Sequence, residues 1–201
     1  MNLKDIIKIT LNLIVIYIVG GLLLAGVYAV TSPIIFVKNK EEKEIALKKM
    51  ISDAQSIAKP ENGDWDIEFN KKPKHVEYFV AKKDNQVIGY VVETYGKGYS
   101  SFINILVALD KDLKILGINI LEHGETPGLG DEIDKPGFKG QFISKDLDHL
   151  VLVKGDANGK IAAITGATIS SRAVTKGVRA GVEMITKRLS GESSGVNNEQ
   201  H

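Results

Sequence analysis

Residues 76–121 read VEYFVAKKDNQVIGYVVETYGKGYSSFINILVALDKDLKILGINIL and carry the clearest structural pattern in the chain. The pattern consists of runs of β-branched and aromatic residues, each typical of a strand, at positions 76–81, 87–95, 102–109 and 115–121. Segments 83–85 and 110–112, with the sequences KDN and DKD, have the composition of tight turns. This part of the chain therefore predicts an antiparallel meander of four strands.

Shorter patterns after the meander predict two more strands and a final helix. Residues 150–153 and 161–164 are apolar and flank the turn-forming segment 155–159. Residues 170–189 have a helical period, and one face of that helix is expected to pack on the core. Its members are Val174, Val178, Val182, Ile185 and Leu189. The tail, residues 190–201, is rich in Ser, Gly and Asn and is expected to be disordered.

The N-terminal segment predicts a membrane span. Residues 9–30 are almost wholly apolar, and at ~1.5 Å per residue such a helix crosses a hydrocarbon core of ~30 Å. A cleaved signal peptide is the rival interpretation, but the apolar run exceeds the roughly 7–15 residues of its usual core. We therefore expect a cytoplasmic N-terminus at 1–8 and a transmembrane helix at 9–32.

Residues 33–60 are expected to join this span to the domain at 61–189. An imperfect helical period runs over 41–58 and is ended by Pro60, which predicts an amphipathic helix there. Together these patterns predict an α+β fold with a mainly antiparallel sheet and flanking helices, behind one transmembrane helix.

Composition excludes several classes of function. The 201 residues include 26 Lys and Arg and 25 Asp and Glu, mixed along the chain without a basic stripe, so nucleic-acid binding has no support. The chain has no cysteine, which removes disulfides, thiolate chemistry and iron–sulfur ligation. Redox chemistry would have to come from a bound organic cofactor.

A small-residue turn, Thr165-Gly166-Ala167-Thr168, opens onto the last predicted helix. Gly166 and Ala167 let backbone approach a ligand, and the free N–H groups and positive dipole of a first helical turn stabilise an anion. The spacing is neither that of a P-loop nor that of a dinucleotide fingerprint. By itself this turn predicts either an anion site or an ordinary helix cap formed by the Thr168 hydroxyl.

A second motif, Glu122-His123-Gly124-Glu125-Thr126-Pro127-Gly128-Leu129-Gly130-Asp131, follows the fourth strand. Pro127 fixes φ and the two later glycines permit positive φ, so a tight turn that holds Leu129 outward is predicted. Such a loop can place backbone and one apolar side chain against a flat ring. It can equally be a plain connection between a strand and a helix.

These two motifs and the segment 95–99, YGKGY, resemble a known family when taken together and in this order. It is the FMN-binding domain family that the G subunit of Rnf-type ion-translocating ferredoxin:NAD oxidoreductase complexes shares with the C subunit of the sodium-pumping NADH:quinone reductase. The resemblance runs from the membrane segment to about Leu189. The length of the chain is similar to that of the first of these two proteins.

The resemblance implies that Thr168 carries FMN through a phosphodiester, installed by a separate flavin transferase that uses FAD. It also implies that the segment around Tyr99 and the proline–glycine loop line the flavin. The site residues implied in this way, besides Thr168 and Tyr99, are Thr165, Gly166, Ala167, Ser170, Ser171, Glu125, Thr126, Pro127, Gly128, Leu129 and Gly130.

In function, the resemblance implies an electron-relaying membrane flavoprotein that works with the other subunits of a redox-driven ion pump and turns over no substrate alone. Its domain would lie outside the cytoplasm. The count of Lys and Arg favours the opposite orientation, with Lys4 and Lys8 before the span and five lysines at 38–49 after it, but that count has little force for a large C-terminal domain.

One position departs from the family pattern. The family's acceptor motif usually begins with Asp six residues before the threonine, and this chain has Ala162 there. That difference keeps open a membrane-tethered sensor or scaffold that binds FMN without a covalent bond. A third hypothesis makes Thr168 a nucleophile in acyl or phosphoryl transfer, but no base stands in a recognisable relation to it.

The remaining candidates have simpler interpretations. His123 lies between two glutamates, which is a weak metal set, and we interpret it as loop structure or a flavin neighbour. The acidic residues Asp131, Glu132 and Asp134 are expected to start a helix, since they lack the spacing of a calcium loop. Trp65 is expected to cover the sheet edge or meet a partner. Arg172 could pair with the phosphate or with solvent.

Overall fold

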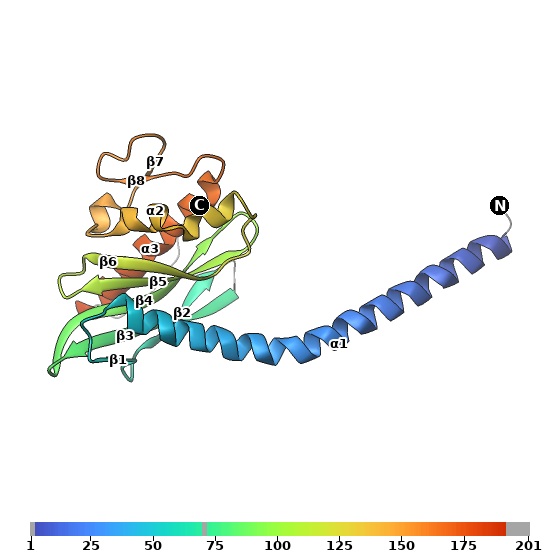
Figure 1. The fold of residues 1–201 in the computed structure, drawn as a ribbon, viewed down its shortest axis with the longest axis horizontal. Coiled ribbons are helices and arrows are strands. Elements are labelled where there is room, and N and C mark those ends of the chain that lie inside the picture. Colours follow the sequence, from blue (N-terminus) through green and yellow to red (C-terminus); the bar gives the residue numbers. More distant parts are fainter. Residues whose placement is uncertain (1–2, 70–71, 192–201) are drawn as a thin grey trace. The chain divides into compact units, whose positions relative to one another are not determined.

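A computed structural model describes residues 3–69 and 72–191 and contains an antiparallel sheet with helices, as predicted. The chain divides after Lys43 into two compact units, and the second unit contains the sheet and everything that follows it. The elements in chain order are α1 Leu3–Met50, β1 Ser56–Ala58, β2 Asp64–Phe69, β3 Lys72–Lys83, β4 Gln86–Lys97, β5 Phe102–Asp110, β6 Ile115–Glu122, η1 Gly130–Asp134, α2 Pro136–Lys139, η2 Gly140–Phe142, η3 Leu147–His149, β7 Leu152–Val153, β8 Ile161–Ala162 and α3 Thr168–Leu189 (Figure 1).

The four-stranded meander is confirmed. Strands β3, β4, β5 and β6 pair antiparallel in sequence order, with Val91 opposite Ala108 and Val107 opposite Ile118. The first hairpin turns at Asp84 and Asn85, whose φ angles of 49° and 64° are those of the turns that suit a twisted two-stranded ribbon. Two strands were not predicted: β1 and β2 both pair with β3, which itself begins at Lys72 instead of residue 76.

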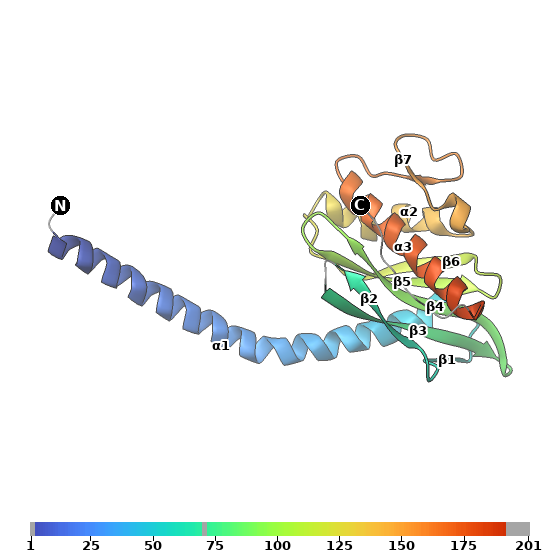
Figure 2. The same ribbon diagram turned by 180° about the vertical axis from the view of Figure 1, so that it is seen from behind.

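The central strands are apolar on both sides because both faces of the sheet are covered. Helix α3 lies across one face, where Val174, Val178, Val182 and Ile185 pack with alternate residues of β5 (Figure 2). On the other face Leu47, at the end of α1, and Ile51, which follows the helix, pack with Val91 of β4 and with Leu106 and Ala108 of β5. The predicted core face of α3 is correct except for Leu189, which is 45% exposed beyond the edge of the core.

The separate amphipathic helix predicted at 41–58 is wrong. Helix α1 is continuous from Leu3 through Pro33 to Met50, so the first half of that segment belongs to it. The second half contains β1, in which Ile57 lies opposite Ala81 of β3. Edge-strand hydrogen bonds to β3 therefore override the helical period of these residues. Within α1 lies an apolar stretch, unburied within the protein, that is long enough to cross a membrane.

The two short strands around residues 155–159 are present but do not form a hairpin. They are shorter than predicted, and β7 and β8 pair parallel, with Leu152 opposite Ile161. The connection from η1 to β8 contributes Ile133, Phe138, Phe142, Leu150 and Ile161 to the α3 side of the core. Most of the tail predicted to be disordered, residues 192–201, lies outside the described residues.

Trp65 lies on β2. Its ring stacks on Tyr78 of β3, with centroids 5.3 Å apart, and packs against the main core. Its buried indole Nε1 has no hydrogen-bond partner among the described residues. Trp65 therefore closes the β2 side of the sheet, which agrees with the expectation that it covers the edge.

Candidate functional site

Thr168 is the first residue of α3, and it does not cap the helix. The N-cap is Ala167, with φ −126° and ψ 37° and no side-chain cap bond. The alternative that the Thr168 hydroxyl caps this helix is therefore wrong. Thr168 is partly exposed, and within the part of the chain that the structure describes its hydroxyl has no hydrogen-bond partner. The hydroxyl is free to react or to bind a ligand.

The turn before Thr168 is held by its own side chains. Gly166 has a φ of 82°, which an L side chain rarely adopts. The Ser171 hydroxyl, fully buried in the first turns of α3, donates to the Ala167 carbonyl at 2.9 Å and accepts the Ile164 N–H at 3.1 Å. Ser171 thus fixes the shape of the turn from within. The implied contact of Ser171 with a cofactor stays a prediction.

The first turn of α3 has free donors. Among the described residues, the backbone N–H groups of Thr168, Ile169 and Ser170 have no backbone acceptor. A 22-residue helix carries a substantial positive dipole end at this point, which stabilises a nearby anion by about 0.3–1 kcal/mol when it is exposed. The surroundings of the Thr168 hydroxyl are therefore suited to a phosphoryl group.

The proline–glycine loop reaches this turn. The Thr126 carbonyl accepts the N–H groups of Leu129 at 3.2 Å and Gly130 at 3.0 Å, which closes a tight turn. Leu129 is 49% exposed, and a Cβ added to Gly166 would lie 3.3 Å from its Cδ2 atom. The loop therefore holds Leu129 outward as its composition predicts, beside the turn that contains Thr168.

Glu125 joins three segments that the sequence separates. Its side chain is 5% exposed, and its Oε2 atom accepts the Tyr99 N–H at 3.1 Å and the Ser170 hydroxyl. Its Oε1 atom accepts the Ser100 N–H at 3.1 Å and the Ser101 N–H at 3.5 Å. The β4–β5 connection, the proline–glycine loop and the start of α3 therefore meet at one carboxylate.

The environment keeps this carboxylate ionised. Burial by itself raises the pKa of Glu125, but the hydrogen bonds from Ser170 and from the N–H groups of residues 99–101 outweigh burial and hold that pKa below its ordinary value. Space around it is tight, because side chains at Gly98 or Gly130 would collide with Glu125 atoms. Glycine at these two positions permits the close approach of the loops.

The structure thus brings most of the implied site residues together, but in different roles. Thr165, Gly166 and Leu129 are exposed, and Tyr99 is 73% exposed, so they can meet a ligand. Ala167, Ser170, Ser171 and Glu125 are buried and support the turn and the loops. The Tyr95 side chain accepts a hydrogen bond from Asn104 and lies near Lys74. Burial, followed by the nearby Glu93 and Glu122, raises the pKa of Tyr95 to about 12.

One supporting residue, Gln141 of η2, was not predicted. Its side-chain amide accepts the Ala162 N–H at 2.7 Å and donates to the Ala162 carbonyl at 3.3 Å. The amide therefore hydrogen-bonds the backbone beside β8 as a neighbouring strand would, at Ala162, where the resemblance predicts Asp. No local pattern marks this residue, because its partner lies 21 positions away.

His123 and the acidic residues make hydrogen bonds and ion pairs close to themselves in the chain, and the alternative that His123 is a flavin neighbour stays a prediction. The His123 Nδ1 atom accepts the Glu125 N–H at 3.2 Å inside the loop. Asp131, Glu132 and Asp134 lie in η1, and Glu132 and Asp134 pair with Lys135 and Lys139. Arg172 is exposed, and the described residues offer it no ion-pair partner.

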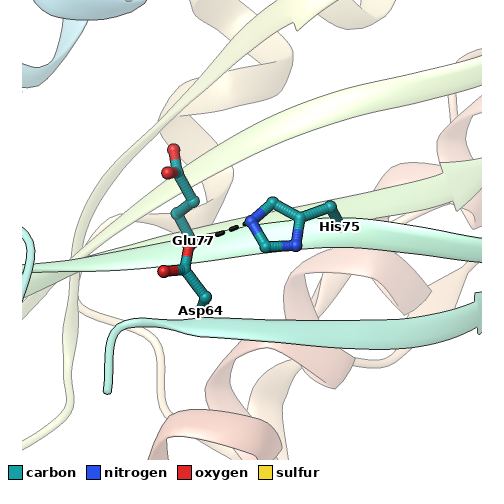
Figure 3. Close-up of side chains that lie close together, drawn as sticks. All are labelled: Asp64, His75 and Glu77. Atoms are coloured by element: carbon teal, nitrogen blue, oxygen red, sulfur yellow. Dashed lines mark hydrogen bonds and ion pairs between the residues drawn. The ribbon is translucent and has the colours of Figure 1, made fainter. Parts of the chain in front are cut away.

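A separate group of possible metal ligands lies on β2 and β3. Asp64, His75 and Glu77 place one ligand atom each within 4.8 Å of one another, and Figure 3 shows His75 hydrogen-bonded to Asp64. The Lys59 ammonium group lies 2.9 Å from Asp64 Oδ1 and 3.0 Å from Glu77 Oε1, so a cation already bridges the two carboxylates. Asp66 and Asp64 raise the pKa of His75 through hydrogen bonds. We interpret the group as an ion-pair network on a strand pair.

The comparisons with known proteins agree with this geometry. The family described as "FMN-binding domain" matches residues 98–183, which include all three loop segments. The G subunit of the proton-translocating ferredoxin:NAD(+) oxidoreductase complex of Clostridium ljungdahlii is 38% identical over 190 residues, covering 94% of this chain and 96% of its own. The G subunit of the Na(+)-translocating complex of Acetobacterium woodii is 31% identical and covers 90% of this chain and 92% of its own.

Solved structures show a similar fold. The crystal structure of Shewanella oneidensis NqrC aligns with a TM-score of 0.51 at 25% identity, over 71% of this chain and 74% of its own. The C subunit of the Na(+)-translocating NADH-quinone reductase from Parabacteroides distasonis aligns with a TM-score of 0.55 at 22% identity, over 81% and 97%. The second likeness shows the fold alone.

Proposed function

Because this chain belongs to the family of G subunits of ion-translocating ferredoxin:NAD oxidoreductase complexes, we propose that it carries FMN covalently on Thr168 and relays electrons within such a complex. The chain is a flavoprotein subunit of an oxidoreductase that translocates ions. The covalent bond, the flavin transferase that makes it and the orientation in the membrane belong to the proposal.

The observation that carries the proposal is the state of Thr168. Its hydroxyl is partly exposed at the start of α3, and among the described residues it has no partner. Free N–H groups of the first helical turn are available for a phosphate. Exposed Leu129 lies beside the same turn and offers apolar surface to a ring. The residues present therefore fit a phosphate-linked flavin.

Attachment needs no catalytic group from this chain. The Thr168 Oγ–phosphorus bond forms as the phosphoanhydride of FAD breaks, AMP leaves, and the hydroxyl proton passes to the transferase or solvent. The attached FMN supplies electron transfer, singly or in pairs. The protein residues bind the phosphate and orient the ring. The Thr168 hydroxyl has no hydrogen-bond partner among the described residues, so the alternative of Thr168 as a nucleophilic catalyst gains no support from its contacts.

Covalent retention suits a domain outside the cytoplasm, where a lost flavin could not be rebound from a cytoplasmic pool. We therefore place the second unit on the extracytoplasmic side of the membrane, behind the α1 span. Its partners are the membrane and peripheral subunits of the complex.

Intact mass tests the proposal. We expect protein produced with the flavin transferase to gain the mass of one FMN less one water, and Thr168→Ala to abolish the gain. The matched control is Thr186→Ala on the same helix, whose hydroxyl donates to the Val182 carbonyl at 2.7 Å; it should keep the gain.

Two outcomes contradict the proposal. An unshifted mass with yellow colour that is lost on denaturation would indicate a non-covalent FMN domain, the alternative that Ala162 keeps open. A natively purified complex in which this chain is colourless would rule out the electron relay itself.

A further inference from the structure

The carboxylate of Glu125 is buried beside the proposed flavin site, and the role that we assign to it rests on the proposed function. A carboxylate that is 5% exposed is costly unless hydrogen bonds replace its water. Glu125 has such bonds from three backbone N–H groups and one hydroxyl. Hydrogen bonds to an ionised group are about twice as strong as those between neutral groups. The four bonds to Glu125 therefore hold its loop firmly to the segments that donate them.

The donors come from different parts of the site. Tyr99, Ser100 and Ser101 belong to the connection between β4 and β5, and Ser170 belongs to the first turn of α3, two residues after Thr168. Glu125 itself opens the loop that carries Leu129. No other described hydrogen bond joins residues 99–101 to α3. Among the described residues, this carboxylate is therefore the hydrogen-bonded link between Tyr99 and the first turn of α3.

We propose that Glu125 is a positioning residue for the flavin: it holds the loop of Tyr99 and the loop of Leu129 in fixed places beside Thr168, and so sets the orientation of the attached ring. Glu125 acts through those loops and needs no contact with the ring. The loops of Tyr99 and Leu129 orient the ring, and the Glu125 carboxylate holds those loops in place.

The substitution Glu125→Gln tests this with little change in shape. The amide keeps one acceptor oxygen, and its NH₂ group replaces the other. Because backbone N–H groups face both oxygens, at least one of them must lose its acceptor whichever way the amide turns. Glu122→Gln, three residues earlier, is the matched control: it removes the same charge, and no described hydrogen bond joins Glu122 to residues 99–101.

The first readout is the visible circular dichroism of the attached flavin. The isoalloxazine ring is achiral, so its visible signal arises from ordered surroundings. We expect Glu125→Gln to lose most of that signal while its far-ultraviolet spectrum is unchanged, and Glu122→Gln to keep both. A folded, flavinylated Glu125→Gln protein with the wild-type visible spectrum would overturn the inference.

The second readout does not need the flavin. Hydrogen exchange at the Ser100 and Ser101 amides should become about tenfold faster in Glu125→Gln and unchanged in Glu122→Gln. If Glu125→Gln does not fold, Ser170→Ala replaces it, since it removes one of the bonds and leaves the backbone donors intact; a smaller change in the same direction is expected.

Failure of the two proposals can be told apart. If the wild-type chain gains no mass, the proposal of a covalent flavin is wrong, and so is the proposal that Glu125 positions an attached ring. If exchange at the Ser100 and Ser101 amides is unchanged in the Glu125→Gln protein, the positioning role of Glu125 is wrong, even where the wild-type chain gains the mass of FMN.

Discussion

Three hydroxyl groups within four positions of α3 have three different environments. Thr168 is partly exposed with no partner among the described residues, Ser170 donates to Glu125, and Ser171 is bonded within its own turn. The difference follows from the direction in which each side chain leaves the first helical turn, because successive residues are rotated by about 100°. One residue is thus left for a ligand while its neighbours hold the turn in shape.

The charge of Glu125 predicts a pH dependence of stability. Its folded pKa lies below the ordinary value of 4.5, so ionisation stabilises the fold fully above the unfolded pKa, and that stability is lost as the pH falls through the folded pKa. We expect the difference in Tm between the wild-type and Glu125→Gln proteins to be constant from neutral pH to about pH 5 and to shrink below it. Thermal unfolding followed by circular dichroism would measure it. A difference that persists unchanged to about pH 3 would show that the charge does not contribute.

Helix α3 can approach β4 and β5 closely because Gly177 has no side chain. A Cβ added to Gly177 would lie 3.0 Å from Ile105 Cδ1 and 3.1 Å from the Tyr95 carbonyl oxygen. The Gly177 carbonyl accepts the buried Thr94 hydroxyl at 3.0 Å, which ties the helix to the strand. This contact sets the height of α3 above the sheet, and with it the position of the first turn that carries Thr168.

Gly177→Ala is therefore expected to destabilise the domain. Alanine favours a helix by about 0.8–1.0 kcal/mol over glycine, but overpacking a tight contact costs about 1–3 kcal/mol. We expect a lower Tm, measured for the purified protein in detergent. Gly137→Ala in α2 is the control, since nothing lies within 4 Å of an added Cβ there, and it should leave Tm unchanged or raise it. A Gly177→Ala protein as stable as the control would show that the sheet moves to accommodate the methyl group.

At the scale of the whole molecule, the chain consists of an apolar helical unit and a folded domain, and the division falls after Lys43. The last turns of α1, which contain Leu47, belong to the domain because they cover one face of the sheet. The membrane segment and the domain are thus joined by continuous helix instead of the predicted linker. Residues 44–50 would be ordered wherever the domain is folded.

The proposed orientation is testable in membrane vesicles. An epitope fused after His201 should be digested by protease added to sealed right-side-out vesicles, because the domain is expected outside the cytoplasm. Inverted vesicles should protect the same epitope until detergent is added. The reverse pattern would place the domain in the cytoplasm, as the count of flanking lysines favours, and would remove the retention argument for a covalent flavin.

Much of this protein follows from local sequence. The meander at 76–121, the apolar N-terminal segment and the core face of α3 all have strong periodic patterns, and the structure contains each of them. The segment 95–99, the loop at 122–131 and the turn at 165–168, taken together and in this order, carry the resemblance to the family. These features depend on side chains close together in the chain, so they can be read without the fold.

Tertiary structure alone decided the rest. β1 forms in a segment with a helical period because its backbone hydrogen-bonds to the edge of β3. Gln141 hydrogen-bonds to the backbone of Ala162, which lies 21 positions away. Glu125 can hydrogen-bond to Tyr99 and Ser170 only after folding has brought these residues next to its own loop. Hydrogen bonds between distant segments depend on which segments the fold places side by side. A local pattern of residues does not specify that arrangement.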